Sequence, residues 1–259
     1  MLELRTIKAG MTNDSHMLVI DEKKYIVRIP GKGSENLLSR QSEFEAYEAI
    51  NSLGISDEVL FLDPKNGYKI SRFIQDARNC DPNNFDEVKL CLDKLKVLHT
   101  ANLKVKAIFD PFERVEFYRD LCKNPKPQPD IFSLKRFLTP VEPRLCHIDA
   151  NHDNFLFYQN NLKLIDWEYS AMSDPLVDVA MFAIYAMYNR DQVDKLIELY
   201  GTENKYRVYV YIAVCGLIWS NWCDYKAELG IDFGEYSTAQ YRFANEYLEI
   251  FTKEWNKDV

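Results

Sequence analysis

The hydrophobic pattern of this chain changes its period near residue 74, and that change limits the folds the chain can adopt. Before it, residues 34–54 show the period of a helix, with Ser34 able to cap its start and Gly54 its end. Short segments of alternating or β-branched residues surround this helix. These segments cover residues 2–10, 15–21, 24–30 and 59–74, the last a hairpin that turns at Pro64 and Asn66-Gly67. We expect a small antiparallel sheet carrying one helix.

Beyond residue 74 the apolar residues recur at helical spacing. Residues 85–100 and the long apolar segment 205–229, which Gly230 ends, are the clearest helices. The proline-rich residues 125–129 indicate a surface loop. We therefore predict an α+β chain with two lobes: a small lobe of residues 1–74 and a larger, mainly helical lobe of residues 75–259.

The overall composition argues against several classes of partner. The formal net charge of −8 does not suit a nucleic-acid partner, which needs a basic face. The N-terminal segment lacks the apolar stretch of a signal peptide, and no apolar run reaches membrane-spanning length. The six cysteines form no C-x-x-C pair. We expect a cytoplasmic protein with reduced thiols that does not insert into a membrane.

The segment LCHIDANHDNFL, residues 145–156, supports two incompatible interpretations. Asp149 and Asn154 form the D-x-x-x-x-N pattern of a phosphotransferase loop, and an apolar strand further on carries Asp166. Phosphoryl transfer needs one carboxylate at the acceptor hydroxyl, an amide oxygen on a metal ion, and a second carboxylate on the metal that bridges the phosphates. A hairpin between Asn154 and Asp166 would bring these two residues together.

The other interpretation is the metal cluster of a hydrolase. It would use His147 and Asp149 with His152 and Asp153, but it needs more ligands than the chain offers at suitable spacing. The remaining histidines, His16 and His99, do not lie in such a loop. The phosphotransferase interpretation is favoured, with His147 as a residue that stabilises the loop, and His152 and Asp153 as solvated loop residues.

Arg28 lies on the third predicted strand, where a kinase carries the cation that holds phosphates. Its acidic partner should come from the next helix, with Glu43 the better candidate and Glu45 the alternative. The segment AGMTNDS offers small polar residues that can cover phosphates, namely Thr12 and Asn13. The segment GKGS at residues 31–34 is not a phosphate-binding P-loop, because Gly33 stands where Ser or Thr must follow the lysine.

These motifs together resemble the choline/ethanolamine kinase and aminoglycoside phosphotransferase-like families, relatives of the protein kinases. The resemblance covers nearly the whole chain, through AGMTN, YIVRIPGKGSENLLSRQSE, CHIDANHDNFL, LIDWEYSAMSDPLVDVA and IWSNWCDYKAELGIDFGEY. It implies a protein-kinase-like fold and an ATP-dependent choline kinase. One departure from the pattern is that Arg28 stands where many kinases have lysine.

The resemblance also assigns individual roles. It implies Asp149 as the catalytic base, Asn154 and Asp166 as magnesium ligands, and Asp178 as a carboxylate that braces the loop. It places the adenine at the end of the strand 70–74, which contains Ser71 and Phe73.

The aromatic content of 14% bears on the acceptor. A quaternary ammonium has no N–H to donate, so its binding sites use aromatic ring faces. Trp219, Trp222 and Tyr225 lie three residues apart on one predicted helix, and Tyr169 and Tyr185 are candidates for the opposite wall. Without the resemblance we would favour a plain core stripe. Ethanolamine, thiamine and aminoglycoside kinases stay open, as does an inactive kinase-like binding protein, which the presence of Asp149, Asn154 and Asp166 disfavours.

Overall fold

The computed structural model describes residues 2–9, 13–31 and 38–258, and the chain divides into two compact units. The first unit comprises residues 1–107 and 152–171, and the second comprises residues 108–151 and 172–259. This division by compactness differs from the predicted boundary at residue 74, because the first unit also takes in a helix and a hairpin from later in the chain. The assignment of nucleotide binding and catalysis to residues 1–74 and 75–259 stays a prediction.

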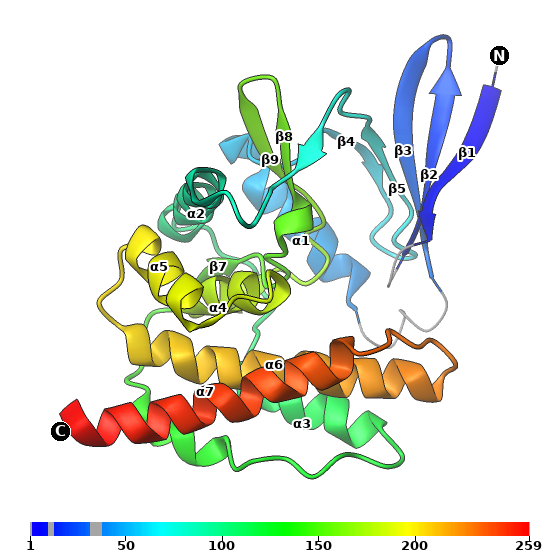
Figure 1. Cartoon of the computed structure of the whole chain (residues 1–259). Helices are drawn as coiled ribbons and strands as arrows, with labels where there is room; N and C mark the ends of the chain where they lie inside the picture. Colours follow the sequence, from blue (N-terminus) through cyan, green and yellow to red (C-terminus); the bar gives the residue numbers. More distant parts are fainter. Residues whose placement is uncertain (1, 10–12, 32–37, 259) are drawn as a thin grey trace. The chain divides into compact units, whose positions relative to one another are not determined.

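The first unit contains the predicted antiparallel sheet, whose five strands follow the order β1-β2-β3-β5-β4. Asp21 and Glu22 both adopt positive φ, of 47° and 67°, in the two-residue turn between β2 and β3, which is the geometry that such tight hairpins favour. Strand β3 lies between β2 and β5, so its residues are paired on both edges (Figure 1). The strands are β1 (Leu2–Ala9), β2 (Asn13–Ile20), β3 (Lys23–Pro30), β4 (Val59–Leu62) and β5 (Lys69–Arg72).

The predicted helix of this unit is present but starts later than expected. Helix α1 (Arg40–Ile50) begins after Ser39, whose hydroxyl accepts a hydrogen bond from the Ser42 N–H at 3.2 Å. The predicted start at Ser34 is therefore wrong, and residues 32–37 lie outside the described part of the chain. A 3₁₀ turn, η1 (Asn51–Leu53), continues α1 and ends at Gly54 with φ 61°, as predicted for a residue that must adopt a left-handed conformation.

A helix and a small second sheet complete the first unit. Helix α2 (Phe85–Thr100) matches its predicted range, and its apolar side, which includes Val88, Leu92 and Leu95, is fully buried. The predicted hairpin before Asp166 is confirmed. Its strands join β6 in the order β6-β8-β9, with bounds β6 (Arg78–Asn79), β8 (Phe155–Tyr158) and β9 (Asn161–Leu164).

The second unit is mainly helical, as predicted for the later part of the chain. Helix α6 is buried along most of its length and packs against α3, α4 and α7 (Figure 1). At Gly216 the backbone of α7 comes so close that a Cβ would lie 2.6 Å from the Gln240 carbonyl oxygen, so only glycine fits. The helices are α3 (Pro111–Leu121), α4 (Leu176–Tyr185), α5 (Arg190–Tyr200), α6 (Lys205–Glu228) and α7 (Tyr236–Asp258).

Three shorter features lie mainly in the second unit: the 3₁₀ segment η2 (Phe132–Phe137), and strand β7 (Arg144–Cys146) paired with β10 (Ala171–Ser173). The proline-rich residues 125–129 form a loop, as predicted. Among the described residues, no helix is both long and apolar enough to cross a membrane.

Candidate active site

The first unit joins Arg28 to Glu43, the acidic partner predicted for it, and to Asp166, a predicted metal ligand. The guanidinium lies 2.5 Å from the Glu43 carboxylate and 3.1 Å from that of Asp166. Burial alone would lower the pKa of Arg28, but Glu43, Asp166 and Glu168 outweigh it, so the pKa is raised and the group keeps its charge. Glu45, the alternative partner, instead lies 3.4 Å from Lys106. The predicted Arg28–Glu43 pair is therefore present.

Two further residues close this network, and sequence reasoning did not assign a role to either. Arg40 lies 3.5 Å from Glu43 and 3.1 Å from Glu168, and Glu168 lies 3.8 Å from Arg28. The four side chains alternate in charge and form a closed circuit, which we call the charged ring (Arg28, Glu43, Arg40 and Glu168). Burial raises the pKa of Glu168 to about 7, and Asp166 adds to the rise while Arg28 opposes it.

Asn13, a predicted phosphate-covering residue, is attached to the charged ring. Its side-chain N–H donates to Glu168 at 2.7 Å, and its side-chain oxygen accepts from Arg40 at 3.2 Å. Asn13 is buried, being 7% exposed, at the start of β2. Thr12, predicted beside it, lies outside the described residues.

The β8–β9 hairpin places Asn154 and Asp166 at its two ends. The Ile165 N–H donates to the Asn154 carbonyl at 2.9 Å, next to the paired residues Phe155 and Leu164. Asp166 has φ 66°, a left-handed conformation that aspartate adopts more readily than most residues with a side chain, and its carboxylate is about one-third exposed. An exposed carboxylate and an amide oxygen are hard donors of the kind that magnesium prefers, so the residues present suit that ion.

Ser71 and Phe73, the predicted adenine contacts, lie at the end of β5. Ser71 is buried and is paired with Ile26 of β3, while the Phe73 N–H donates to the Lys24 carbonyl at 3.2 Å. The Lys24 ammonium lies 5.6 Å from the centre of the Phe73 ring. These contacts fix the strand end; its role in nucleotide binding stays a prediction.

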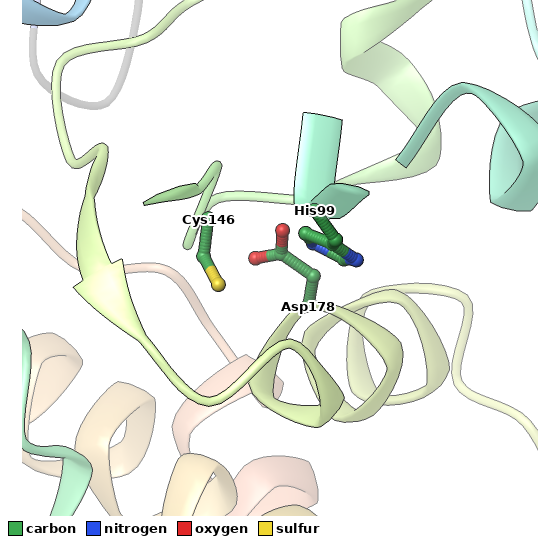
Figure 2. Close-up of side chains that lie close together, drawn as sticks. All are labelled: His99, Cys146 and Asp178. Atoms are coloured by element: carbon green, nitrogen blue, oxygen red, sulfur yellow. The ribbon is translucent and has the colours of Figure 1, made fainter. Parts of the chain in front are cut away.

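In the second unit, the segment before Asp149 is held by Asp178 of α4. The Asp178 carboxylate, fully buried, accepts the backbone N–H groups of His147 at 2.8 Å and Ile148 at 2.7 Å. Ile148 has φ 68°, a strained conformation for a β-branched residue, so the backbone needs such support. Figure 2 shows the Asp178 carboxylate near the thiol of Cys146, whose pKa is raised by burial and by that carboxylate.

Asp149 itself contacts an aromatic cluster. The hydroxyl of Tyr185, the last residue of α4, donates to the Asp149 carboxylate at 2.5 Å. The Tyr185 and Trp219 rings lie 5.6 Å apart, and the Trp219 and Trp222 rings also lie 5.6 Å apart. Three of the predicted acceptor residues are thus brought together beside the predicted catalytic base.

Further residues that sequence reasoning did not select individually extend this cluster. The Phe233 ring stacks on Trp222 with centres 5.1 Å apart, and the buried Lys226 ammonium lies 5.4 Å from the centre of the Trp222 ring. Burial raises the pKa of the Tyr236 hydroxyl, and the nearby Cys223 and Asp149 raise it further. The aromatic sequence FGEY, residues 233–236, was the available signal for this wall.

The other two predicted acceptor residues are placed differently. Tyr225 is half-buried on α6 and forms no ring pair with either tryptophan within the described residues. Tyr169 belongs to the first unit, where it is half-buried. We define the aromatic cluster as Tyr185, Trp219, Trp222 and Phe233.

The histidines and Asp153 of the disfavoured metal-cluster interpretation differ in burial and in their contacts. His147 is fully buried, whereas the Asp153 side chain is half exposed and accepts a hydrogen bond from Asn79 at 2.7 Å. Burial lowers the pKa of His152, which lies with Asp153 in the 3₁₀ turn η3 (His152–Asn154).

Comparison with known proteins identifies the family of this chain. Residues 75–210, more than half of the chain, match the model of the phosphotransferase enzyme family. Protein LicA of Haemophilus influenzae is 28% identical over 92% of this chain and 99% of that protein.

Two solved structures are similar over nearly all of the chain. Choline kinase LicA from Streptococcus pneumoniae has a TM-score of 0.86 and 29% identity, covering 95% of this chain and 93% of that one. A structure of LicA in complex with AMP has a TM-score of 0.84 and 29% identity, covering 96% and 92%. The kinase-like fold and the resemblance that the sequence motifs indicated are confirmed. This chain belongs to the phosphotransferase enzyme family and is an ATP-dependent kinase of a small molecule.

Proposed function

We propose that this protein is a choline kinase, which transfers the γ-phosphoryl group of ATP to the hydroxyl of choline to give phosphocholine. The observation that carries the proposal is the aromatic cluster beside Asp149, where the Tyr185 hydroxyl touches the carboxylate and its ring lies 5.6 Å from Trp219. A base next to aromatic rings suits an acceptor that combines a hydroxyl with an organic cation. The similarity to choline kinase LicA supports the same acceptor.

Asp149 serves as the base in this proposal. Its carboxylate accepts the proton of the choline hydroxyl as the oxygen attacks the γ-phosphorus, and the bond to the β,γ-bridging oxygen breaks in line. The hydrogen bond from Tyr185 orients the carboxylate toward the acceptor. Asp178 holds the preceding backbone through its bonds to His147 and Ile148, so the base has little freedom to move.

The first unit supplies the charge that phosphates require. Arg28, kept ionised and aimed by Glu43, binds the phosphate oxygens, and Asn13 covers them from the start of β2. Asn154 and Asp166 would hold magnesium, which neutralises charge on the phosphates when bound. Ser71 and Phe73 lie at the strand end proposed for the adenine.

The chemistry of the aromatic cluster distinguishes choline from ethanolamine. A trimethylammonium group has a diffuse charge and an apolar surface, so ring faces suit it. A primary ammonium donates hydrogen bonds and needs carboxylate or carbonyl partners for them. The cluster of Tyr185, Trp219, Trp222 and Phe233 offers aromatic rings, whereas a polyamine such as an aminoglycoside needs carboxylate or carbonyl partners for its ammonium groups.

A coupled assay of ADP release tests the proposal, with choline, ethanolamine, thiamine and a panel of aminoglycosides as acceptors. We expect kcat/KM for choline to exceed that for ethanolamine at least tenfold, with little turnover of the others. A preference for ethanolamine or an aminoglycoside would reassign the acceptor within the same family. Absence of phosphorylation of every acceptor, in protein that still binds ATP, would refute the proposal.

A further inference from the structure

Arg40 is the least expected member of the charged ring. It is the first residue of α1, where the helix dipole disfavours a cation, and it is nevertheless buried, being 8% exposed. A buried cation at an unfavourable helix position requires a tertiary reason. The structure offers one, because the two terminal nitrogens of Arg40 reach groups from three separate segments.

The contacts of Arg40 join those segments to one another. One terminal nitrogen lies 3.1 Å from Glu168, which follows Asp166 shortly after β9, and 3.5 Å from Glu43 on α1 itself. The other terminal nitrogen donates to the Asn13 side chain at 3.2 Å. Asn13 in turn donates to the same oxygen of Glu168 at 2.7 Å, so the three residues close a triangle.

The contacts of Arg40 compensate the charge of buried carboxylates. Glu43 and Glu168 are 1% and 5% exposed, and buried carboxylates need a cation or several hydrogen bonds. Arg28 lies 2.5 Å from Glu43 and 3.1 Å from Asp166, but 3.8 Å from Glu168. Arg40, at 3.1 Å, is the nearer cation to Glu168. Without Arg40, Glu168 would compete with Glu43 and Asp166 for the single guanidinium of Arg28.

The turn between β4 and β5 holds the stem of Arg40 in place. Gly67 has φ 77°, and a Cβ there would lie 2.4 Å from Cδ of Arg40, so the absence of a side chain makes room for the arginine. The Gly67 carbonyl also accepts from Arg28 at 3.4 Å. The same turn therefore lies against both arginines of the charged ring.

We propose that Arg40 is a positioning residue for the nucleotide. By compensating Glu168 and holding Asn13, it leaves Arg28 aimed at Asp166 and at the phosphates. The proposal rests on the assignment of ATP binding to this unit, and it concerns affinity for the nucleotide, not for the acceptor. Substitution of Arg40 should therefore raise the KM for MgATP and leave the KM for choline unchanged.

The test compares Arg40→Met, Arg40→Lys and a control, Arg78→Met. Arg78 lies in the same unit, is more than half exposed, and pairs with Glu87 at 2.8 Å. We expect Arg40→Met to raise the KM for MgATP at least tenfold, with the KM for choline within twofold of wild type. Arg40→Lys should recover part of the affinity, because lysine restores the charge but cannot bond Glu168 and Asn13 with two nitrogens. The control should match wild type in both constants.

A second readout is independent of the acceptor: the rise in melting temperature on adding MgATP, which measures nucleotide binding directly. It should shrink in Arg40→Met and persist in Arg78→Met. If Arg40→Met fails to fold, Arg40→Met/Glu168→Gln removes the uncompensated carboxylate, and this variant should fold yet still bind MgATP weakly because Asn13 loses its hydrogen bond from Arg40.

A wild-type KM and thermal shift for MgATP in Arg40→Met, or in the double variant where the single one does not fold, would overturn the proposal. A lower kcat with both KM values unchanged would also overturn it, because that result shows no effect of Arg40 on the affinity for the nucleotide. If wild-type protein binds MgATP but phosphorylates no choline, the proposed acceptor fails while the thermal shift still decides the role of Arg40.

Discussion

The charged ring of the first unit and the aromatic cluster of the second unit each accompany an acidic residue, but they surround it with different chemistry. Asp166 lies 3.1 Å from an arginine within a network of buried ion pairs. Asp149 instead accepts a hydrogen bond from a tyrosine whose ring packs on a tryptophan. One carboxylate is compensated by full charges, and the other by a neutral hydroxyl among rings.

This difference corresponds to the two ligands of the proposed reaction. Phosphates and magnesium carry concentrated charge, and preorganised ion pairs hold such ligands with little rearrangement. A quaternary ammonium carries a diffuse charge, and ring faces attract it without hydrogen bonds. Substitutions in one region should therefore change the constants of one ligand, and each prediction below tests that separation.

The largest effect is expected for Asp149→Asn. Loss of the base should lower kcat about 10²–10⁴-fold. The rise in melting temperature caused by MgATP should persist, because Arg28 and Asp166 are untouched. Asp153→Asn is the matched control, since Asp153 is a half-exposed residue of the same segment that bonds Asn79, and it should keep the wild-type kcat. A kcat for Asp149→Asn near that of wild type would show that Asp149 is not the catalytic base.

Arg28→Met should affect the other ligand. Removing a charged hydrogen bond of about 1.5–3 kcal/mol should raise the KM for MgATP about 10–150-fold and lower kcat. Arg28→Lys should retain part of the activity, because it keeps the charge without the forked geometry. The KM for choline should stay within twofold of wild type. Unchanged constants for MgATP would show that the Arg28–Glu43 pair has only a structural role.

Trp219→Ala should raise the KM for choline with little change for MgATP. A desolvated cation–π contact is worth about 1–2 kcal/mol, which corresponds to about 5–30-fold. Trp255→Ala is the matched control, because Trp255 of α7 packs in a separate cluster, on Phe251 at 5.4 Å between ring centres. Thermal unfolding of both variants measures damage to the core. If both tryptophan variants bind choline equally, the aromatic cluster is only part of the core.

Tyr185→Phe should separate the two functions of one side chain. The ring stays against Trp219, so the KM for choline should hold, while loss of the hydrogen bond to Asp149 should cost about 1 kcal/mol, or ~5-fold in kcat. Tyr241→Phe serves as control, since its hydroxyl donates to the Pro127 carbonyl at 2.6 Å. Equal kcat values for Tyr185→Phe and wild type would mean that the hydroxyl does not orient the base.

The smallest effect is expected for Glu87→Gln, which measures an exposed ion pair against the buried charged ring. The hydrogen bond from Arg78 lowers the pKa of Glu87, so the folded state loses this stabilisation as pH falls through the lowered pKa. At pH 7 the variant should lose less than about 1 kcal/mol of unfolding free energy. Thermal unfolding should show the difference from wild type shrinking as pH falls below the unfolded value of ~4.3. A difference that grows in acid would contradict the assignment.

The sequence alone determined the elements that depend on local pattern. Strands β1 to β3, helix α2 and the β8–β9 hairpin follow from apolar period and turn residues close together in the chain. Asp149, Asn154 and Asp166 also lie within one short segment, so catalytic and metal-binding roles could be predicted for them without knowledge of any distant contact. Family resemblance then supplied Asp178, whose role no local pattern indicates.

The tertiary structure alone decided which distant side chains share a site. Arg40 and Glu168 are 128 positions apart, and Tyr185 lies 36 positions after Asp149. For Arg40 the local signal even pointed away from a role, because the helix dipole disfavours a cation at that position. Phe233 likewise follows the end of α6 with no helical period to place it against Trp222. Such contacts form only when helices and strands from distant parts of the sequence pack together. Their free energy comes from burial and charge compensation in the folded chain, which the local sequence pattern does not contain.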